Sequence, residues 1–135
     1  MNPFRITLTV YTEDTDYGGV VYHPNYFKYM ERARTEWLNH IGYSLAKLAD
    51  EHILFVLRLA TLEFIKPAKL NDILQVTCRI SDNTRTQLWF EQSITRQEAP
   101  ETLLTLGKIQ LVCINTDFKP IRIPEGILEA SYHAR

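Results

Sequence analysis

Hydrophobic and polar residues alternate near the start of the chain and through most of its second half. Residues 4–12 alternate in this way, which predicts a strand with one buried face. Longer segments of strand character follow at residues 53–67, 73–82, 86–96 and 103–115. Turn-forming residues such as Pro, Asn and Asp separate these segments, so we expect successive strands to pair antiparallel.

Between residues 24 and 41 the apolar positions change to the spacing of a helix. They recur at steps of three and four residues, with charged residues on the other face. Pro24 suits the first helical position because its fixed φ matches a helix and its missing N–H would have no intrahelical partner there. Gly42 is expected to end this helix. A short helix is predicted at residues 44–51, with Ser44 as its cap.

This order of elements predicts an α+β domain. A sheet with one apolar face must bury that face against another element, and only the helix at 24–41 is long enough to cover it. A final short helix is predicted after Pro124, and the chain shows neither an internal repeat nor a linker. We therefore expect a single domain over residues 1–135, in which a five-stranded antiparallel sheet wraps around one long helix.

Composition narrows the class of protein. The chain has 135 residues, of which 45% are hydrophobic and 23% charged, as in a globular domain with a core. A net charge of −1 argues against nucleic-acid binding. We find neither an apolar run long enough to span a membrane nor the pattern of a secretory signal, so a cytoplasmic protein is expected. Cys78 and Cys113 lie among apolar strand residues and are expected to be buried free thiols.

Unusual polar residues gather at positions 13–26, between the first strand and the long helix. The first turn of a helix presents unpaired N–H groups and a partial positive charge, which can stabilise a developing oxyanion. A nearby carboxylate can attack a carbonyl carbon or activate water. Gly18 and Gly19 allow the backbone to approach a ligand closely. The segment suits acyl chemistry, although acidic residues also precede helices simply because they complement the helix dipole.

Other kinds of site find less support in the sequence. A metal site made of Glu13, Asp14, Asp16 and His23 would lack the ligand spacing typical of such sites, so no metal is expected. None of the serines lies in a nucleophile-elbow motif, and both cysteines are expected to be buried.

One long motif and two shorter ones resemble a known family. Residues 11–26 read YTEDTDYGGVVYHPNY, residues 30–38 read MERARTEWL, and residues 64–72 read FIKPAKLND. Together they are similar to the hotdog-fold acyl-CoA thioesterases of the 4-hydroxybenzoyl-CoA thioesterase group, above all to the YbgC-type, Tol–Pal-associated branch. The resemblance runs through nearly the whole chain. It implies the hotdog fold, five antiparallel strands around a long helix, in agreement with the periodicity.

The resemblance also implies roles for individual residues. The catalytic aspartate of the family falls on Asp16, and the backbone N–H that polarises the thioester carbonyl in aromatic-thioester relatives falls on His23. The side chain of His23 matches the histidine of the YbgC-type motif and is expected to contact the thioester region or position water. An alternative is that this side chain only caps the helix or packs between subunits. Substrate contacts are expected from Gly18, Gly19, Tyr22, Pro24 and Tyr26.

Two positions qualify this correspondence. Thr12 stands where several YbgC-type members have a tyrosine, four positions before the catalytic aspartate, so no phenol is expected there. Asp14 is interpreted as a structural residue rather than as a second catalytic acid.

The implied reaction is hydrolysis of an acyl-CoA thioester to a free carboxylic acid and CoA. Asp16 would act either as a nucleophile, through a mixed anhydride, or as a general base on water, and the sequence leaves both open. No metal or organic cofactor is implied. Alternatives are an aromatic, 4-hydroxybenzoyl-CoA-like thioesterase and a non-catalytic partner that binds acyl-CoA or acyl carrier protein. The helix lacks the His/Asp or His/Glu arrangement of hotdog dehydratases.

The resemblance further implies a homodimer or tetramer, with the active site between two subunits. Exposed edges of a five-stranded sheet favour such pairing. The acyl donor is expected to be acyl-CoA, with acyl carrier protein as an alternative. On charge alone, five cations are candidates for the CoA phosphates: Lys66, Lys69, Arg79, Arg85 and Arg96.

Overall fold

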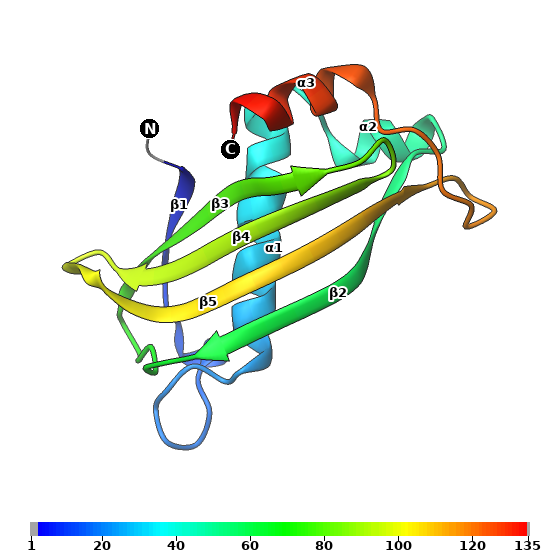
Figure 1. The fold of residues 1–135 in the computed structure, drawn as a ribbon. Helices are drawn as coiled ribbons and strands as arrows, with labels where there is room; N and C mark the ends of the chain where they lie inside the picture. Colours follow the sequence, from blue (N-terminus) through cyan, green and yellow to red (C-terminus); the bar gives the residue numbers. More distant parts are fainter. Residues whose placement is uncertain (1–2, 135) are drawn as a thin grey trace.

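A computed structural model describes residues 3–134, so the two ends of the predicted 1–135 domain lie outside the described residues. Its elements follow one another in the predicted order (Figure 1). In chain order they are β1 (Phe4–Thr9), a 3₁₀ turn (Thr12–Asp14), α1 (Pro24–His40), α2 (Leu45–Asp50), β2 (Leu54–Phe64), β3 (Ile73–Asn83), β4 (Gln87–Arg96), β5 (Ala99–Ile114) and α3 (Glu125–His133). Among the described residues, no helix combines the length and apolar character that a membrane crossing requires.

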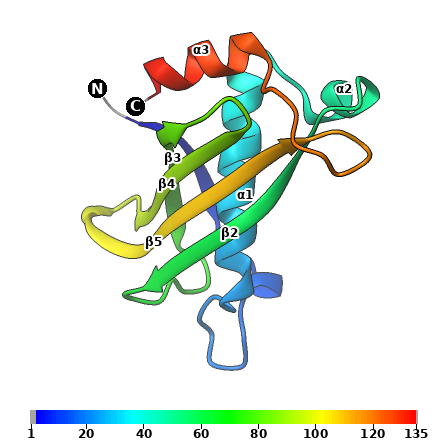
Figure 2. The same cartoon turned by 45° about the vertical axis from the view of Figure 1, so that its right-hand side comes forward.

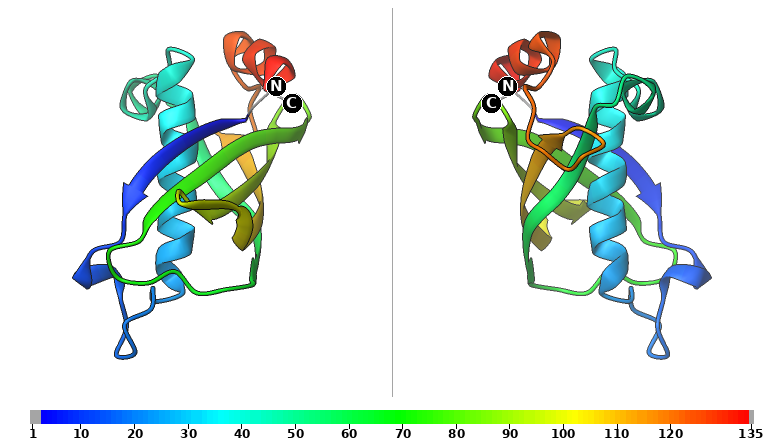
Figure 3. Two further views of the ribbon diagram at one scale, coloured as in Figure 1. Left: turned by 90° about the vertical axis from the view of Figure 1, so that its left-hand side faces the viewer. Right: turned by 90° about the vertical axis from the view of Figure 1, so that its right-hand side faces the viewer.

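The predicted sheet around a helix is confirmed. The five strands form one antiparallel sheet in the order β1-β3-β4-β5-β2. The sheet curves around α1, which lies along its concave side, as two rotated views make clear (Figures 2 and 3). Pro24 is the first residue of α1, and Gly42 follows its end with a φ of 94°. Ser44 caps α2 by accepting a hydrogen bond from the Lys47 N–H at 3.4 Å.

The expectation that successive strands pair is correct for β3–β4 and β4–β5 but wrong for β2 and β3. The helix carries the chain across the concave face, so β2 joins the sheet at the edge opposite β1 and pairs with β5. Residues 65–72 then pass the start of α1 and bring the chain back to β3, which pairs with β1 (Figure 3). The start of the helix and this crossover therefore come together.

Some predicted strand boundaries are also wrong. β1 ends at Thr9 rather than at residue 12, because Thr12–Asp14 turn back as a 3₁₀ helix in which the Thr15 N–H donates to the Thr12 carbonyl. β5 starts at Ala99 rather than at residue 103. Two register shifts near Thr95 and Arg96 accommodate Pro100 there, as β-bulges do near the end of a hairpin.

The core lies between α1 and the concave face of the sheet. Trp37 of the helix packs edge-on against Phe90 of β4, with ring centroids 5.9 Å apart. Both cysteines are free and buried, as predicted. Burial raises the pKa of Cys78 to about 12 and that of Cys113 to about 11, so neither thiol is a nucleophile at neutral pH.

A buried polar link joins α1 to the middle of the sheet. Arg34 of the MERARTEWL motif is buried and donates a hydrogen bond to Gln92 Oε1 on β4 at 2.9 Å. Gln92 in turn donates through Nε2 to the Met30 and Thr77 carbonyls at 3.0 and 3.2 Å. These bonds fix the rotation of the helix about its axis, because they join one of its faces to β4.

Gly107 on β5 allows the helix to approach the sheet closely. A Cβ at this position would lie 2.5 Å from the sulfur of Met30, which is fully buried. We expect Gly107→Ala to lower the free energy of unfolding by about 1–3 kcal/mol through overpacking. Denaturant unfolding would measure the change. Gly18→Ala is the matched control, since a Cβ there would meet only an ordinary contact at 3.5 Å. Equal stabilities of the two variants would contradict this account.

Candidate active site

The segment between β1 and α1 forms a small closed loop below the start of the helix (Figure 1). The Asp16 N–H donates to the Val20 carbonyl at 2.8 Å, and Thr15 and Val21 form a β-bridge. The side chain of Asp16 is exposed, and its Oδ1 accepts a hydrogen bond from the Gly18 N–H at 2.8 Å. Gly19 has a φ of 80°, a conformation that other residues rarely adopt, so the turn requires glycine there. The loop thus presents the Asp16 carboxylate to solvent.

Asp14 differs from Asp16 in being buried. Its carboxylate accepts a hydrogen bond from the Tyr11 N–H at 2.9 Å, and its carbonyl accepts one from the Tyr22 N–H at 2.8 Å. Backbone N–H groups of the chain itself therefore bind one carboxylate oxygen and the carbonyl oxygen of Asp14.

The start of α1 presents one free backbone donor. Pro24 has no N–H, and the Asn25 N–H donates to the Tyr22 carbonyl at 2.9 Å. The His23 N–H finds no hydrogen-bond partner within residues 3–134. It lies at the positive end of the helix dipole, where a backbone N–H favours an anion or a developing oxyanion.

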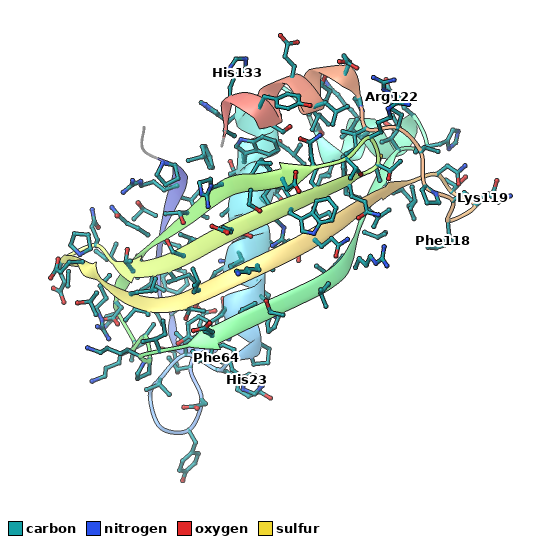
Figure 4. The ribbon with its side chains drawn as sticks, in the orientation of Figure 1. His23, Phe64, Phe118, Lys119, Arg122 and His133 are labelled. Atoms are coloured by element: carbon teal, nitrogen blue, oxygen red, sulfur yellow. The ribbon has the colours of Figure 1, made fainter. Side chains whose placement is uncertain are left out.

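The side chain of His23 lies beside the lower end of β2 (Figure 4). Its ring centroid is 6.3 Å from that of Phe64, in an edge-on arrangement, and 5.0 Å from that of Tyr22. A shallow pocket of about 220 Å³ opens here between the helix start and the crossover after β2. Its lining residues are Val21, His23, Tyr26, Phe64, Ile65, Lys66 and Pro67.

The structure brings only some of the predicted site residues together. His23 and Tyr26 line the pocket, and the Tyr22 ring lies beside that of His23 in a tilted arrangement. Asp16, Gly18 and Gly19 lie in the adjacent loop and do not line it in the single chain, nor does Pro24. Lys66 of the pocket was a candidate on charge alone, whereas Phe64, Ile65 and Pro67 were missed as site residues, although the FIKPAKLND motif contains them.

Tyr26 and Tyr29 are buried on consecutive turns of α1 but differ in their hydroxyl groups. The Tyr26 hydroxyl accepts a hydrogen bond from the Ala68 N–H at 3.1 Å and so ties the crossover to the helix. The Tyr29 hydroxyl makes no hydrogen bond within the described chain. Burial raises the pKa of both phenols, and the neighbouring Asp14 carboxylate raises that of Tyr29 further.

The candidate cations have different surroundings. Arg96 pairs with Asp72 at 2.9 Å and donates to the Pro67 carbonyl, so it supports the crossover. Arg79 pairs with Glu91 across β3 and β4. Lys66 is exposed at the pocket and is the candidate placed best for a phosphate. Within residues 3–134, no group of three or more His, Cys, Asp or Glu side chains could hold a metal ion.

Comparisons with known proteins point to one family. The model of the thioesterase-like superfamily matches residues 10–131. The acyl-CoA thioester hydrolase YbgC of Escherichia coli O6:H1 is 41% identical over 93% of this chain and 92% of its own length. The acyl-CoA thioesterase YbgC of Haemophilus influenzae is 33% identical over 99% and 98%. The crystal structure of a 1,4-dihydroxy-2-naphthoyl-CoA thioesterase from Synechocystis superposes with a TM-score of 0.90 at 26% identity, over 97% and 96% of the two chains.

The fold and these relatives therefore define a hotdog-fold thioester hydrolase. The chain belongs to the thioesterase-like superfamily, and its YbgC relatives span nearly its whole length. The family, the fold and the enzyme class predicted from the sequence are confirmed.

The two buried phenols allow a matched test. We expect Tyr26→Phe to lower the free energy of unfolding by about 1–3 kcal/mol, because it leaves the Ala68 N–H without its acceptor. Tyr29→Phe removes a buried hydroxyl that makes no hydrogen bond of normal geometry, with the Asp14 carboxylate near it, so the loss of stability should be smaller than for Tyr26→Phe. Thermal and denaturant unfolding would compare the two variants. A larger loss for Tyr29→Phe than for Tyr26→Phe would refute this assignment.

Proposed function

We propose that the enzyme hydrolyses acyl-CoA thioesters to a free carboxylic acid and CoA, with Asp16 as its catalytic carboxylate. One observation carries the proposal: the unpartnered His23 N–H lies at the start of α1 beside a pocket and next to the loop that carries Asp16. The names of the curated relatives support the substrate class.

In this mechanism the thioester carbonyl oxygen binds the His23 N–H. A well-placed donor of this kind stabilises the tetrahedral intermediate by roughly 2.7–4 kcal/mol. The Asp16 carboxylate attacks the carbonyl carbon to give a mixed anhydride, which water then hydrolyses. Alternatively, it removes a proton from water that attacks the same carbon. In both routes the CoA thiolate leaves, and because a thiolate is a good leaving group no strong general acid is needed.

The remaining predicted residues shape this site. Gly18 and Gly19 allow the loop to turn close to the acyl group, and Pro24 leaves the His23 N–H as the first donor of the helix. The His23 imidazole, between Tyr22 and Phe64, contacts the thioester or positions water. Lys66 at the pocket rim suits a CoA phosphate.

The acyl group itself is proposed to be aliphatic, as the YbgC likeness favours. The solved Synechocystis relative is named for an aromatic substrate, so a benzoyl-type acyl group is the alternative. Acyl carrier protein in place of CoA as the acyl carrier is a further variant of the same reaction. A panel of substrates separates these cases.

A second copy of the chain is proposed to complete the site. β2 is an edge strand of 11 residues, and its Leu57, Leu59 and Phe64 are 54%, 57% and 52% exposed. Such a long apolar edge is a template for pairing with another strand. Pairing of β2 with its counterpart brings the pocket beside Phe64 against the neighbouring subunit, so we propose a homodimer, alone or within a tetramer.

Thiol release from a panel of acyl-CoAs tests the reaction. The panel runs from short to long aliphatic chains and includes benzoyl types and an acyl carrier protein thioester. We expect hydrolysis by the wild type and a loss of about 10²- to 10⁴-fold in Asp16→Asn, which removes the charge and keeps the volume. Asp50→Asn, at the exposed end of α2, is the matched control and should keep full activity.

Near-normal turnover by Asp16→Asn would show that the aspartate is assigned wrongly. Binding of acyl-CoA by the wild type without hydrolysis of any substrate would favour the non-catalytic binding partner instead.

Leu59→Lys tests the proposed subunit contact. A lysine on the free edge of β2 blocks strand pairing, so we expect the variant to be smaller than the wild type by sedimentation and to lose activity. Ile73→Lys is the control, because Ile73 is 46% exposed but belongs to β3, which has a neighbour on each side. A wild-type mass for Leu59→Lys would place the contact elsewhere.

A further inference from the structure

The carbonyl oxygen of Asp14 is the point where the Asp16 loop and the start of α1 are joined. It accepts two hydrogen bonds, one from the Tyr22 N–H at 2.8 Å and one from Asn25 Nδ2 at 2.9 Å. Asp14 and Asn25 are 8% and 9% exposed, so water does not compete freely for these bonds. The two residues are 11 positions apart in the chain.

Each bond fixes a different part of the site. The bond from Tyr22 closes the neck of the loop that carries Asp16. The bond from Asn25 attaches the same carbonyl to the first turn of α1, and the Asn25 N–H also donates to the Tyr22 carbonyl at 2.9 Å. Asp14 lies two positions before Asp16, and Asn25 lies two positions after His23. The hydrogen bond from the Asn25 side chain is therefore a tertiary contact that holds the Asp16 carboxylate and the His23 N–H in one geometry.

We propose that Asn25 is a positioning residue for thioester hydrolysis, acting through its hydrogen bond to the Asp14 carbonyl. This inference rests on the proposed function of Asp16 and His23. Asn25 is buried and does not line the pocket, so its effect is on the relative placement of the two catalytic groups rather than on binding. A shift of about 1 Å between reacting groups can reduce the rate about 10²-fold.

The partner of the Asn25 side chain is a carbonyl oxygen, so position 25 requires a hydrogen-bond donor. That donor must also have the length of asparagine to reach the oxygen. Asn25→Leu keeps the size but removes the donor. Asn25→Asp keeps the shape and puts a carboxylate opposite the Asp14 carbonyl, which breaks the bond by repulsion. The new charge also lies in the first turn of α1, where the helix dipole favours an anion. This gain opposes the lost bond, so Asn25→Asp should remain folded while its site geometry changes.

Steady-state kinetics with an acyl-CoA that the wild type hydrolyses test the proposal, together with thermal unfolding of each variant. We expect kcat to fall about 10²-fold in Asn25→Leu and Asn25→Asp, with KM unchanged. Asn39→Asp, an exposed asparagine at the other end of α1, is the matched control and should keep the wild-type kcat.

A pH profile distinguishes positioning from a merely structural role. Protonation of the introduced carboxyl in Asn25→Asp restores an O–H donor toward the Asp14 carbonyl. We therefore expect the activity of Asn25→Asp relative to the wild type at the same pH to rise as the pH falls. A flat ratio, or a rise in KM at constant kcat, would overturn the proposal. If Asn25→Leu does not fold, Asn25→Asp decides the question alone.

Asp16→Asn, measured alongside, distinguishes failure of the Asn25 proposal from failure of the proposed function. If Asp16→Asn is inactive while both Asn25 variants are fully active, only the role of Asn25 is refuted. If Asp16→Asn is active, the proposed function fails, and the proposal for Asn25 fails with it.

Discussion

Burial of one face of α1 against the concave side of the sheet is the constraint on which the rest of the structure depends. The buried face includes Met30 and Trp37, and Gly107 allows β5 to approach the helix closely. The Arg34–Gln92 link then fixes the rotation of the helix about its axis. Because the helix is held in this way, its first turn has a fixed position relative to the crossover after β2, and the pocket forms between them.

The start of the helix combines two requirements that are hard to satisfy together. A donor for an oxyanion must stay free of protein partners, yet its position must be rigid. The His23 N–H is unpartnered within the described residues, and Pro24 beside it has no N–H. Hydrogen bonds donated by Asn25 and Tyr22, and one accepted by the Tyr26 hydroxyl, hold the backbone on both sides of it. Rigidity therefore comes from the residues around the donor, and the donor itself remains available.

Two side chains near the candidate site are exposed in the single chain. Asp16 is exposed in its loop, and Phe64 is half-exposed although its strand position, opposite Thr105, faces the helix side. Phe64 lies on the edge strand β2, where apolar side chains have no neighbouring strand to cover them. The proposed second subunit would cover this edge.

Much of the fold follows from local patterns in the sequence. The periodicity places α1, its Pro24 start and the alternating strands, because apolar spacing and helix-start chemistry act over a few residues. The family likeness predicts Asp16 and His23 as site residues. Only the tertiary structure decides that β2 pairs with β5 rather than with β3, since this depends on how the helix crosses the sheet. The same holds for the Asn25–Asp14 bond and for the position of residues 64–67 beside the helix start, because these contacts join segments that are separated in the chain.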